Sequence, residues 1–96
     1  MKRVAIFASG AGSNAAKIIE YFSTSSIVQI ALIVSNKPNA GVLNIANKYA
    51  IPSLLIDKEQ FFRGDAYVEQ LKKSEINFIV LAGFLWKVPE KLIQSF

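Results

Sequence analysis

Apolar residues in this chain cluster in short runs that are nearly continuous rather than alternating with polar residues. Four of these runs are rich in Val, Ile and Leu and cover residues 4–8, 28–34, 53–56 and 78–82. Strands buried on both faces of a sheet have this pattern, because neither face presents polar side chains to water. The pattern therefore predicts four buried strands.

The segments between these runs show the periodicity of amphipathic helices. In residues 14–22 the apolar side chains recur at spacings of three and four, and residues 41–49 and 65–74 repeat this spacing. Near the end of the chain, Pro89 followed by Glu90 is typical of a further helix start. The chain is therefore expected to alternate strands and helices throughout.

This alternation predicts a single α/β domain over residues 1–96. Parallel strands joined by right-handed helical crossovers give a Rossmann-like, three-layer sheet. We expect the strand order 3-2-1-4, which opens a crevice where the winding reverses between the first and fourth strands. The sheet is expected to be incomplete at its C-terminal edge, because the amphipathic run before Phe96 stops without a cap or polar tail. An uncovered edge predicts self-association through that edge.

Composition limits the chemistry that this domain can perform. The 96 residues contain no cysteine and no histidine, which excludes disulfides, thiolate chemistry, a Ser-His-Asp triad and His-ligated zinc. There are 11 Lys and Arg against 7 Asp and Glu, for a formal net charge of +4. The basic residues are scattered, which favours a small anionic ligand over nucleic acid. No apolar run approaches the roughly 20 residues of a membrane-spanning helix, so we expect no membrane association. The absence of cysteine is compatible with a cytoplasmic location.

A glycine-rich loop between the first strand and the first helix is the strongest candidate binding site. Residues 9–15 read SGAGSNA, and glycines let a backbone turn tightly and approach a ligand closely. The free N–H groups of a helix start attract anions, to which Ser13 and Asn14 add side-chain donors. Asn14 has the alternative role of a helix cap, and the whole loop has the alternative role of a plain turn. We predict an anion site here.

The same loop matches G-x-G-x-x-A, a variant of the dinucleotide-binding fingerprint. That fingerprint requires an acid roughly 20 residues further on, which holds the ribose hydroxyls. The second strand instead ends in residues 34–37 (VSNK), without an acid, and this disfavours NAD. An NADP phosphate held by Ser35 and Lys37 stays open, as does a purely structural role for this turn-rich segment.

The segment after the fourth strand, residues 82–89, is the second candidate. In the expected strand order it forms the other wall of the crevice, where backbone N–H and C=O groups can bind a flat heterocycle. The alternative is that Phe84, Leu85 and Trp86 pack beneath the next element.

Three segments of the sequence together resemble a known enzyme family. Residues 7–14 (FASGAGSN), 34–37 (VSNK) and 81–85 (LAGFL) occur in the order and at the spacing found in the N-terminal half of the folate-dependent phosphoribosylglycinamide formyltransferases. The resemblance covers essentially the whole chain. It implies a cytoplasmic enzyme of de novo purine synthesis that transfers the formyl group of 10-formyltetrahydrofolate to the amine of 5-phosphoribosylglycinamide, without a metal. Residues 1–96 would be the substrate-phosphate-binding half of its domain.

The resemblance also implies roles for individual residues. Gly12, Ser13 and Asn14 would bind the substrate phosphate, and Gly83 would lie near the glycinamide end of the substrate. The residues implied to line the folate pocket, largely through backbone groups, are Leu85, Trp86, Lys87 and Val88. Arg63 would correspond to a family arginine that contacts folate. Leu85 and Trp86 stand where many relatives have Met and Arg.

The catalytic residues that the resemblance implies are an Asn, a His and a later Asp, all of which lie beyond Phe96. We therefore expect these 96 residues alone to be inactive in formyl transfer. Two other interpretations stay open. The first is a non-catalytic phosphate- or nucleotide-binding module of the NADP type, which the glycine-rich loop alone supports. The second is a half-domain that needs a separately encoded chain to complete its sheet.

Overall fold

Strands and helices alternate through the computed structural model, which describes residues 1–63 and 66–96, apart from the side chains of residues 63, 66, 90 and 91. In this part of the chain the strands are β1 (Lys2–Phe7), β2 (Val28–Ser35), β3 (Ser53–Leu55) and β4 (Phe78–Leu81). The helices are α1 (Ser13–Phe22), α2 (Gly41–Lys48), α3 (Lys58–Arg63), α4 (Ala66–Lys73) and α5 (Glu90–Ser95). Every predicted strand is present, with ends shifted by at most two residues.

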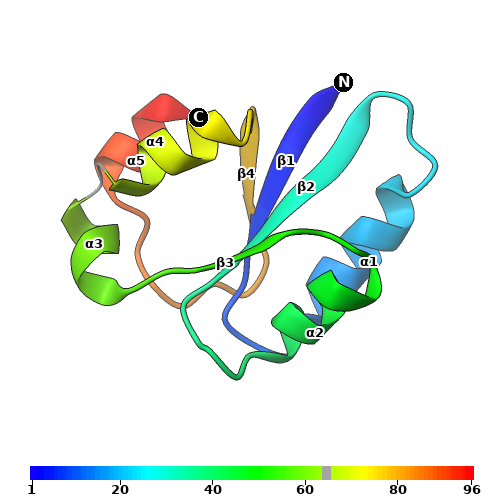
Figure 1. The fold of residues 1–96 in the computed structure, drawn as a ribbon, viewed down its shortest axis with the longest axis horizontal. Coiled ribbons are helices and arrows are strands. Elements are labelled where there is room, and N and C mark those ends of the chain that lie inside the picture. Colours follow the sequence, from blue (N-terminus) through cyan, green and yellow to red (C-terminus); the bar gives the residue numbers. More distant parts are fainter. Residues whose placement is uncertain (64–65) are drawn as a thin grey trace.

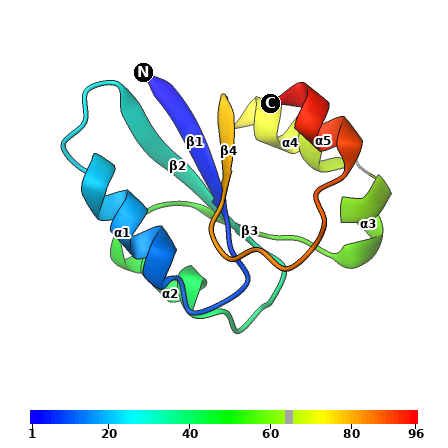
Figure 2. The same cartoon turned by 180° about the vertical axis from the view of Figure 1, so that it is seen from behind.

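The strands form one parallel sheet in the order β3-β2-β1-β4, which confirms the predicted order. Helices α1 and α2 cover one face of this sheet, and α3, α4 and α5 cover the other (Figures 1 and 2). The predicted three-layer, Rossmann-like architecture is therefore confirmed. Because β1 pairs with both β2 and β4, the loops after these three strands lie at the same end of the sheet.

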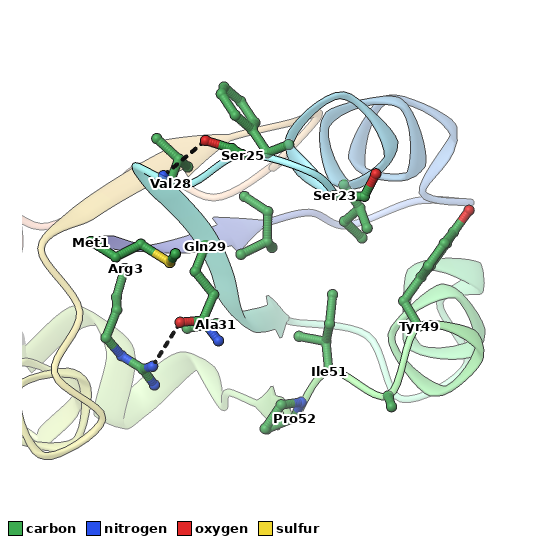
Figure 3. Close-up of a pocket in the computed structure, with 14 residues that line it drawn as sticks. Met1, Arg3, Ser23, Ser25, Val28, Gln29, Ala31, Tyr49, Ile51 and Pro52 are labelled. Carbon is green, nitrogen blue, oxygen red and sulfur yellow. Dashed lines mark hydrogen bonds between the residues drawn. The ribbon is translucent and has the colours of Figure 1, made fainter.

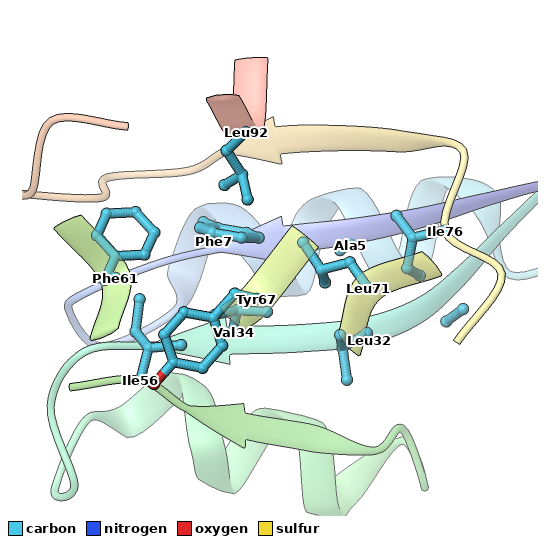
Figure 4. Close-up of a cluster of buried hydrophobic side chains, with 11 residues drawn as sticks. Ala5, Phe7, Leu32, Val34, Ile56, Phe61, Tyr67, Leu71, Ile76 and Leu92 are labelled. Carbon is cyan, nitrogen blue, oxygen red and sulfur yellow. The ribbon is translucent and has the colours of Figure 1, made fainter. Parts of the chain in front are cut away.

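The core has two parts, one on each face of the sheet. Successive side chains of a strand point to opposite faces, so Ala5 and Phe7 belong to one hydrophobic cluster and Ile6 and Ala8 to the other. Figure 4 shows the first cluster, in which Phe7 lies between the sheet and side chains of α3, α4 and α5. The second cluster joins the sheet to α1 and α2. Both clusters meet at β1, which is the most deeply buried strand.

The outer strands are less buried than the sequence predicts. Leu55 on β3, and Phe78 and Leu81 on β4, are each about half exposed. The prediction of strands buried on both faces was therefore wrong for β3 and β4 and is confirmed for most of β1 and β2. The reason is position, since among the described residues each outer strand pairs with a neighbour on one side only.

Helix α3 was not predicted, because six residues are too few to show a helical period. A capping signal does precede it: the carboxylate of Asp57 accepts a hydrogen bond of 2.9 Å from the backbone N–H of Gln60. The ring of Phe61, which is only 1% exposed, then anchors the helix against Phe7 and Phe84 at centroid distances of 6.3 and 5.6 Å. This places α3 beside the loop that follows β4.

Candidate functional site

The loop after β1 contacts both the loop after β4 and the start of α2. The backbone N–H of Ser9 donates to the carbonyl of Gly83 at 3.3 Å, and the N–H of Val42 donates to the carbonyl of Gly10 at 3.2 Å. These segments meet at the carboxyl end of the sheet (Figures 1 and 2). The two loops predicted to form the walls of a crevice therefore lie together, at the point where the strand order reverses.

The start of α1 has the properties of an anion site. Its N-cap is Gly12, with φ 86° and ψ 16°, and no side chain caps the helix. In the part of the chain that the structure describes, the backbone N–H groups of Ser13 and Asn14 have no protein acceptor. The first turn carries no acidic residue that would repel an anion. Asn14 lies exposed inside the helix, so its alternative role as the cap was wrong.

Two glycines at this point are required by the packing of the loop against α2. A Cβ on Gly12 would lie 2.7 Å from the Cα of Val42, and a Cβ on Gly41 would lie 2.8 Å from the carbonyl oxygen of Ala11. Neither position can carry a side chain unless the backbone moves. Gly10 is different, because a Cβ there would meet nothing within 4 Å. The space beside Gly10 is therefore open to a ligand, whereas the missing side chain of Gly12 lets the start of α1 pack against α2.

Ser9 is a residue that sequence reasoning left without a role. Its side chain is 3% exposed, and its hydroxyl donates to Oδ1 of Asn36 at 2.6 Å. The same hydroxyl accepts a hydrogen bond of 2.9 Å from the backbone N–H of Leu85. One side chain thereby ties together the loops that follow β1, β2 and β4. The only signal in the sequence was a small polar residue directly after an apolar strand.

The loop after β4 divides its side chains between the core and solvent. Phe84 and Trp86 pack against the buried cluster, and the Trp86 ring lies 5.6 Å from Phe61 and 5.7 Å from Phe62. Leu85 between them is 70% exposed. The expectation of core packing is therefore confirmed for Phe84 and Trp86 and wrong for Leu85. The remaining predicted residues of this loop are the exposed Gly83, at φ 73°, the exposed Lys87 and the half-buried Val88.

Arg63, Ser35 and Lys37 were predicted for contacts outside these two loops. Arg63 ends α3, and its side chain lies outside the described part of the structure. Ser35 is fully buried and its hydroxyl accepts a 3.3 Å hydrogen bond from the N–H of Lys37, which argues against a contact between Ser35 and an NADP phosphate. Lys37 itself is exposed, and together with Gly10 and Ala11 it borders an open cavity of about 580 Å³.

A second cavity, of about 660 Å³, lies at the opposite end of the sheet (Figure 3). Its lining includes the guanidinium of Arg3, which donates to Oε1 of Gln29, and Tyr49, whose hydroxyl donates to the carboxylate of Glu20 at 2.8 Å. That hydrogen bond raises the pKa of Tyr49 above its usual 10.0. The cavity lies at the opposite end of the sheet from the loops described above, and the side chains of Arg3 and Tyr49 already have hydrogen-bond partners within the protein, so we do not assign the site here.

Two further properties concern metals and membranes. Among residues 1–63 and 66–96, there is no group of three or more His, Cys, Asp or Glu side chains that could hold a metal ion. None of the helices described is both long and apolar enough to cross a membrane.

The strand order and the uncapped helix start at the switch point define a Rossmann-like α/β protein with a candidate anion site. Comparison with known proteins narrows this class. Residues 2–96 match the family model described as formyl transferase, and the chain belongs to this family. The resemblance found in three short sequence segments is thus confirmed over nearly the whole chain.

Individual relatives carry a more specific description. The chloroplastic phosphoribosylglycinamide formyltransferase of Arabidopsis thaliana is 36% identical over 99% of this chain and 35% of its own length. The phosphoribosylglycinamide formyltransferase of Bacillus subtilis is 33% identical over 100% of this chain and 52% of its own length. A crystal structure of the phosphoribosylglycinamide formyltransferase of Bacillus halodurans superposes with a TM-score of 0.84 at 37% identity, over 98% of this chain and 51% of that one. The chain therefore spans about half the length of these bacterial relatives and a third of the plant protein.

Proposed function

We propose that these residues provide the substrate-phosphate site and part of the folate pocket of a phosphoribosylglycinamide formyltransferase, as the N-terminal half of its domain. The observation that carries this proposal is the direct link between the loop after β1 and the loop after β4. Ser9 makes this link through hydrogen bonds to Gly83 and Leu85. This link places the proposed anion site at the start of α1 beside the loop after β4, which is proposed to bind a heterocycle. A reaction between a phosphorylated acceptor and a folate requires these two binding sites to be adjacent. The names of the relatives support the same assignment.

The helix start would hold the phosphate of 5-phosphoribosylglycinamide. The free N–H groups of Ser13 and Asn14 and the positive end of the α1 dipole attract a dianion, and the exposed Ser13 hydroxyl and Asn14 amide add donors. Gly12 would contribute through its backbone, because its position is fixed by Val42. Gly83, on the neighbouring loop, would face the glycinamide end of the acceptor.

The loop after β4 would line the pteridine ring of 10-formyltetrahydrofolate. Leu85 offers an exposed side chain and Lys87 an exposed cation, while Trp86 and Val88 anchor the loop on the core. Arg63 is a further proposed folate contact. The net charge of +4 favours both anionic substrates by attracting them to the surface.

In the proposed reaction, the amine nitrogen of the acceptor forms a bond to the formyl carbon and the bond from that carbon to N10 of the folate breaks. The amine loses a proton and N10 gains one, so a proton-transfer group is needed near the reacting atoms. The chain contains no histidine. The loops described here offer hydroxyl, amide and backbone groups and the exposed amines of Lys37 and Lys87, to which we give the role of attracting the anionic substrates. We therefore propose that they bind and orient the substrates in the cytoplasm, without transferring the formyl group themselves.

Calorimetric titration with 5-phosphoribosylglycinamide tests the phosphate site. Ser13→Ala and Ser23→Ala are a matched pair, because both replace an exposed serine and they lie at opposite ends of α1. Loss of a hydrogen bond to a charged group weakens binding by about tenfold or more, and we expect this for Ser13→Ala only. Equal affinities for the two variants, or no binding by the unmodified chain, would contradict the proposal.

A nucleotide-binding module is the second candidate, and the exposed Lys37 beside Gly10 is the observation that favours it. Two results together would favour this module over the formyltransferase assignment. The first is that the chain binds NADP and that Lys37→Ala weakens this binding. The second is that the fluorescence of Trp86, the single tryptophan, does not respond to 5-formyltetrahydrofolate.

A further inference from the structure

The hydroxyl of Ser9 is buried where three loops meet, and both of its hydrogen-bonding functions are used. Its proton is donated to Oδ1 of Asn36 at 2.6 Å, and its oxygen accepts the N–H of Leu85 at 2.9 Å. The acceptor on Asn36 fixes the rotation of the hydroxyl, so that its lone pair faces Leu85. Ser9 directly precedes Gly10, so the group that holds the loop after β4 is part of the anion-binding loop itself.

We infer that Ser9 is a positioning residue that sets the loop of residues 83–88 relative to the anion-binding loop. The inference rests on the proposed function, since it assigns to Ser9 the geometry of that site. The Ser9 hydroxyl is buried, and its proton and one of its lone pairs are engaged within the protein, so it acts through Leu85 rather than by contact with a substrate. Asn36 is the second member of this arrangement.

The packing of the loop shows why such a link is needed. Leu85 is 70% exposed and contributes little packing, and a Cβ on Gly83 would meet nothing within 4 Å. On both sides of the anchor Phe84, the loop backbone is therefore held by hydrogen bonds to Ser9. The N–H of Ser9 donates to the carbonyl of Gly83, and the hydroxyl of Ser9 accepts from Leu85, so two bonds span Phe84.

Substitutions of nearly equal shape separate the hydroxyl from the space that it fills. Thr and Val have nearly the same shape, and each adds one methyl group to the Ser9 side chain. Ser9→Thr keeps the hydroxyl, whereas Ser9→Val replaces it by a second methyl group, so the comparison of these two variants isolates the hydroxyl. Ser35→Ala is the control, because Ser35 is also fully buried, at the end of β2, and its hydroxyl bonds to Lys37 instead of the loop after β4. Asn36→Ala removes the acceptor without changing the core, and it gives a second test if Ser9→Val does not fold.

Two measurements report on the loop, one without ligand and one with it. Hydrogen exchange of the Leu85 amide reports its hydrogen bond directly. Trp86 fluorescence during titration with 5-formyltetrahydrofolate reports ligand affinity, because Trp86 is the only tryptophan. We expect Ser9→Val to make hydrogen exchange at the Leu85 amide about tenfold faster and the affinity for 5-formyltetrahydrofolate about tenfold weaker. Ser9→Thr and Ser35→Ala should leave both close to their original values, and Asn36→Ala should cause a smaller loss than Ser9→Val.

Each outcome distinguishes this inference from the proposed function. If the unmodified chain binds 5-formyltetrahydrofolate and Ser9→Val behaves like Ser9→Thr, the inference is wrong and the function stands. If the unmodified chain does not bind this folate, the proposed function is wrong. Leu85 exchange then decides the positioning role alone: faster exchange in Ser9→Val than in Ser9→Thr supports it, and equal exchange overturns it.

Discussion

Replacing Gly12 by Ala tests whether this glycine serves the packing of the helices or the binding of a ligand. The new Cβ would lie 2.7 Å from the Cα of Val42 and 2.9 Å from its Cβ, so α2 would have to move. Overpacking of this kind costs about 1–3 kcal/mol, and a φ of 86° adds about 1–2 kcal/mol for a residue with a Cβ. We expect the free energy of unfolding to fall by about 2–5 kcal/mol, a large part of the stability of a small domain.

Urea unfolding followed by Trp86 fluorescence measures this loss. Gly10→Ala is the matched control, because its Cβ would meet nothing within 4 Å, and we expect its stability to change by less than about 0.5 kcal/mol. Adding Val42→Ala should not rescue Gly12→Ala, since alanine keeps the Cα and Cβ that the new atom meets. Equal unfolding free energies for the Gly12 and Gly10 variants would refute the reasoning.

Three further predictions concern stability and ionisation. Phe61→Ala should lower the unfolding free energy by about 3–5 kcal/mol, because this ring is 1% exposed and belongs to the hydrophobic cluster shown in Figure 4. Urea unfolding measures this loss. Asp57→Ala should cost about 1 kcal/mol through loss of the α3 cap, and a loss as large as that of Phe61→Ala would contradict it. Tyr49 should ionise above pH 10.0, because its hydrogen bond to Glu20 raises its pKa; the stability from this bond is complete below that pH and is lost as pH rises through the raised pKa. The difference between the ultraviolet pH titrations of the unmodified protein and of Tyr49→Phe gives the pKa of Tyr49. A titration midpoint of Tyr49 at or below pH 10.0 would count against the hydrogen bond to Glu20.

The fold was predictable because its signals are local. Continuous apolar runs mark the strands of a parallel sheet, and the helical spacing between them implies crossover connections. These two facts, with the handedness of the crossovers, indicate a parallel sheet covered by helices. They do not fix the strand order, and the expected order 3-2-1-4, which the structure shows, was taken from the Rossmann-like arrangement. The position of the candidate anion site was also predictable, because residues 9–15 combine glycines with polar donors directly before a helix; anion binding there stays a prediction.

Features that depend on contacts between distant residues were not predictable. The partners of Ser9 are 27 and 76 positions away in the sequence, and no local pattern indicates them. Gly12 resembles a ligand-binding glycine in the sequence, yet its missing side chain is explained by Val42 on the next helix. Burial of the outer strands was overestimated because an apolar run does not reveal how many neighbours its strand has.

The central claim is that the helix start at Ser13 and Asn14, rather than the cavity beside Tyr49, binds the phosphorylated acceptor. The most direct test follows the backbone amide resonances of the chain during titration with 5-phosphoribosylglycinamide. We expect the largest shifts at Ser13 and Asn14, with smaller shifts at Gly83 and none at Tyr49. Shifts centred on Tyr49, or no shift at the start of α1 when the ligand saturates, would contradict the claim.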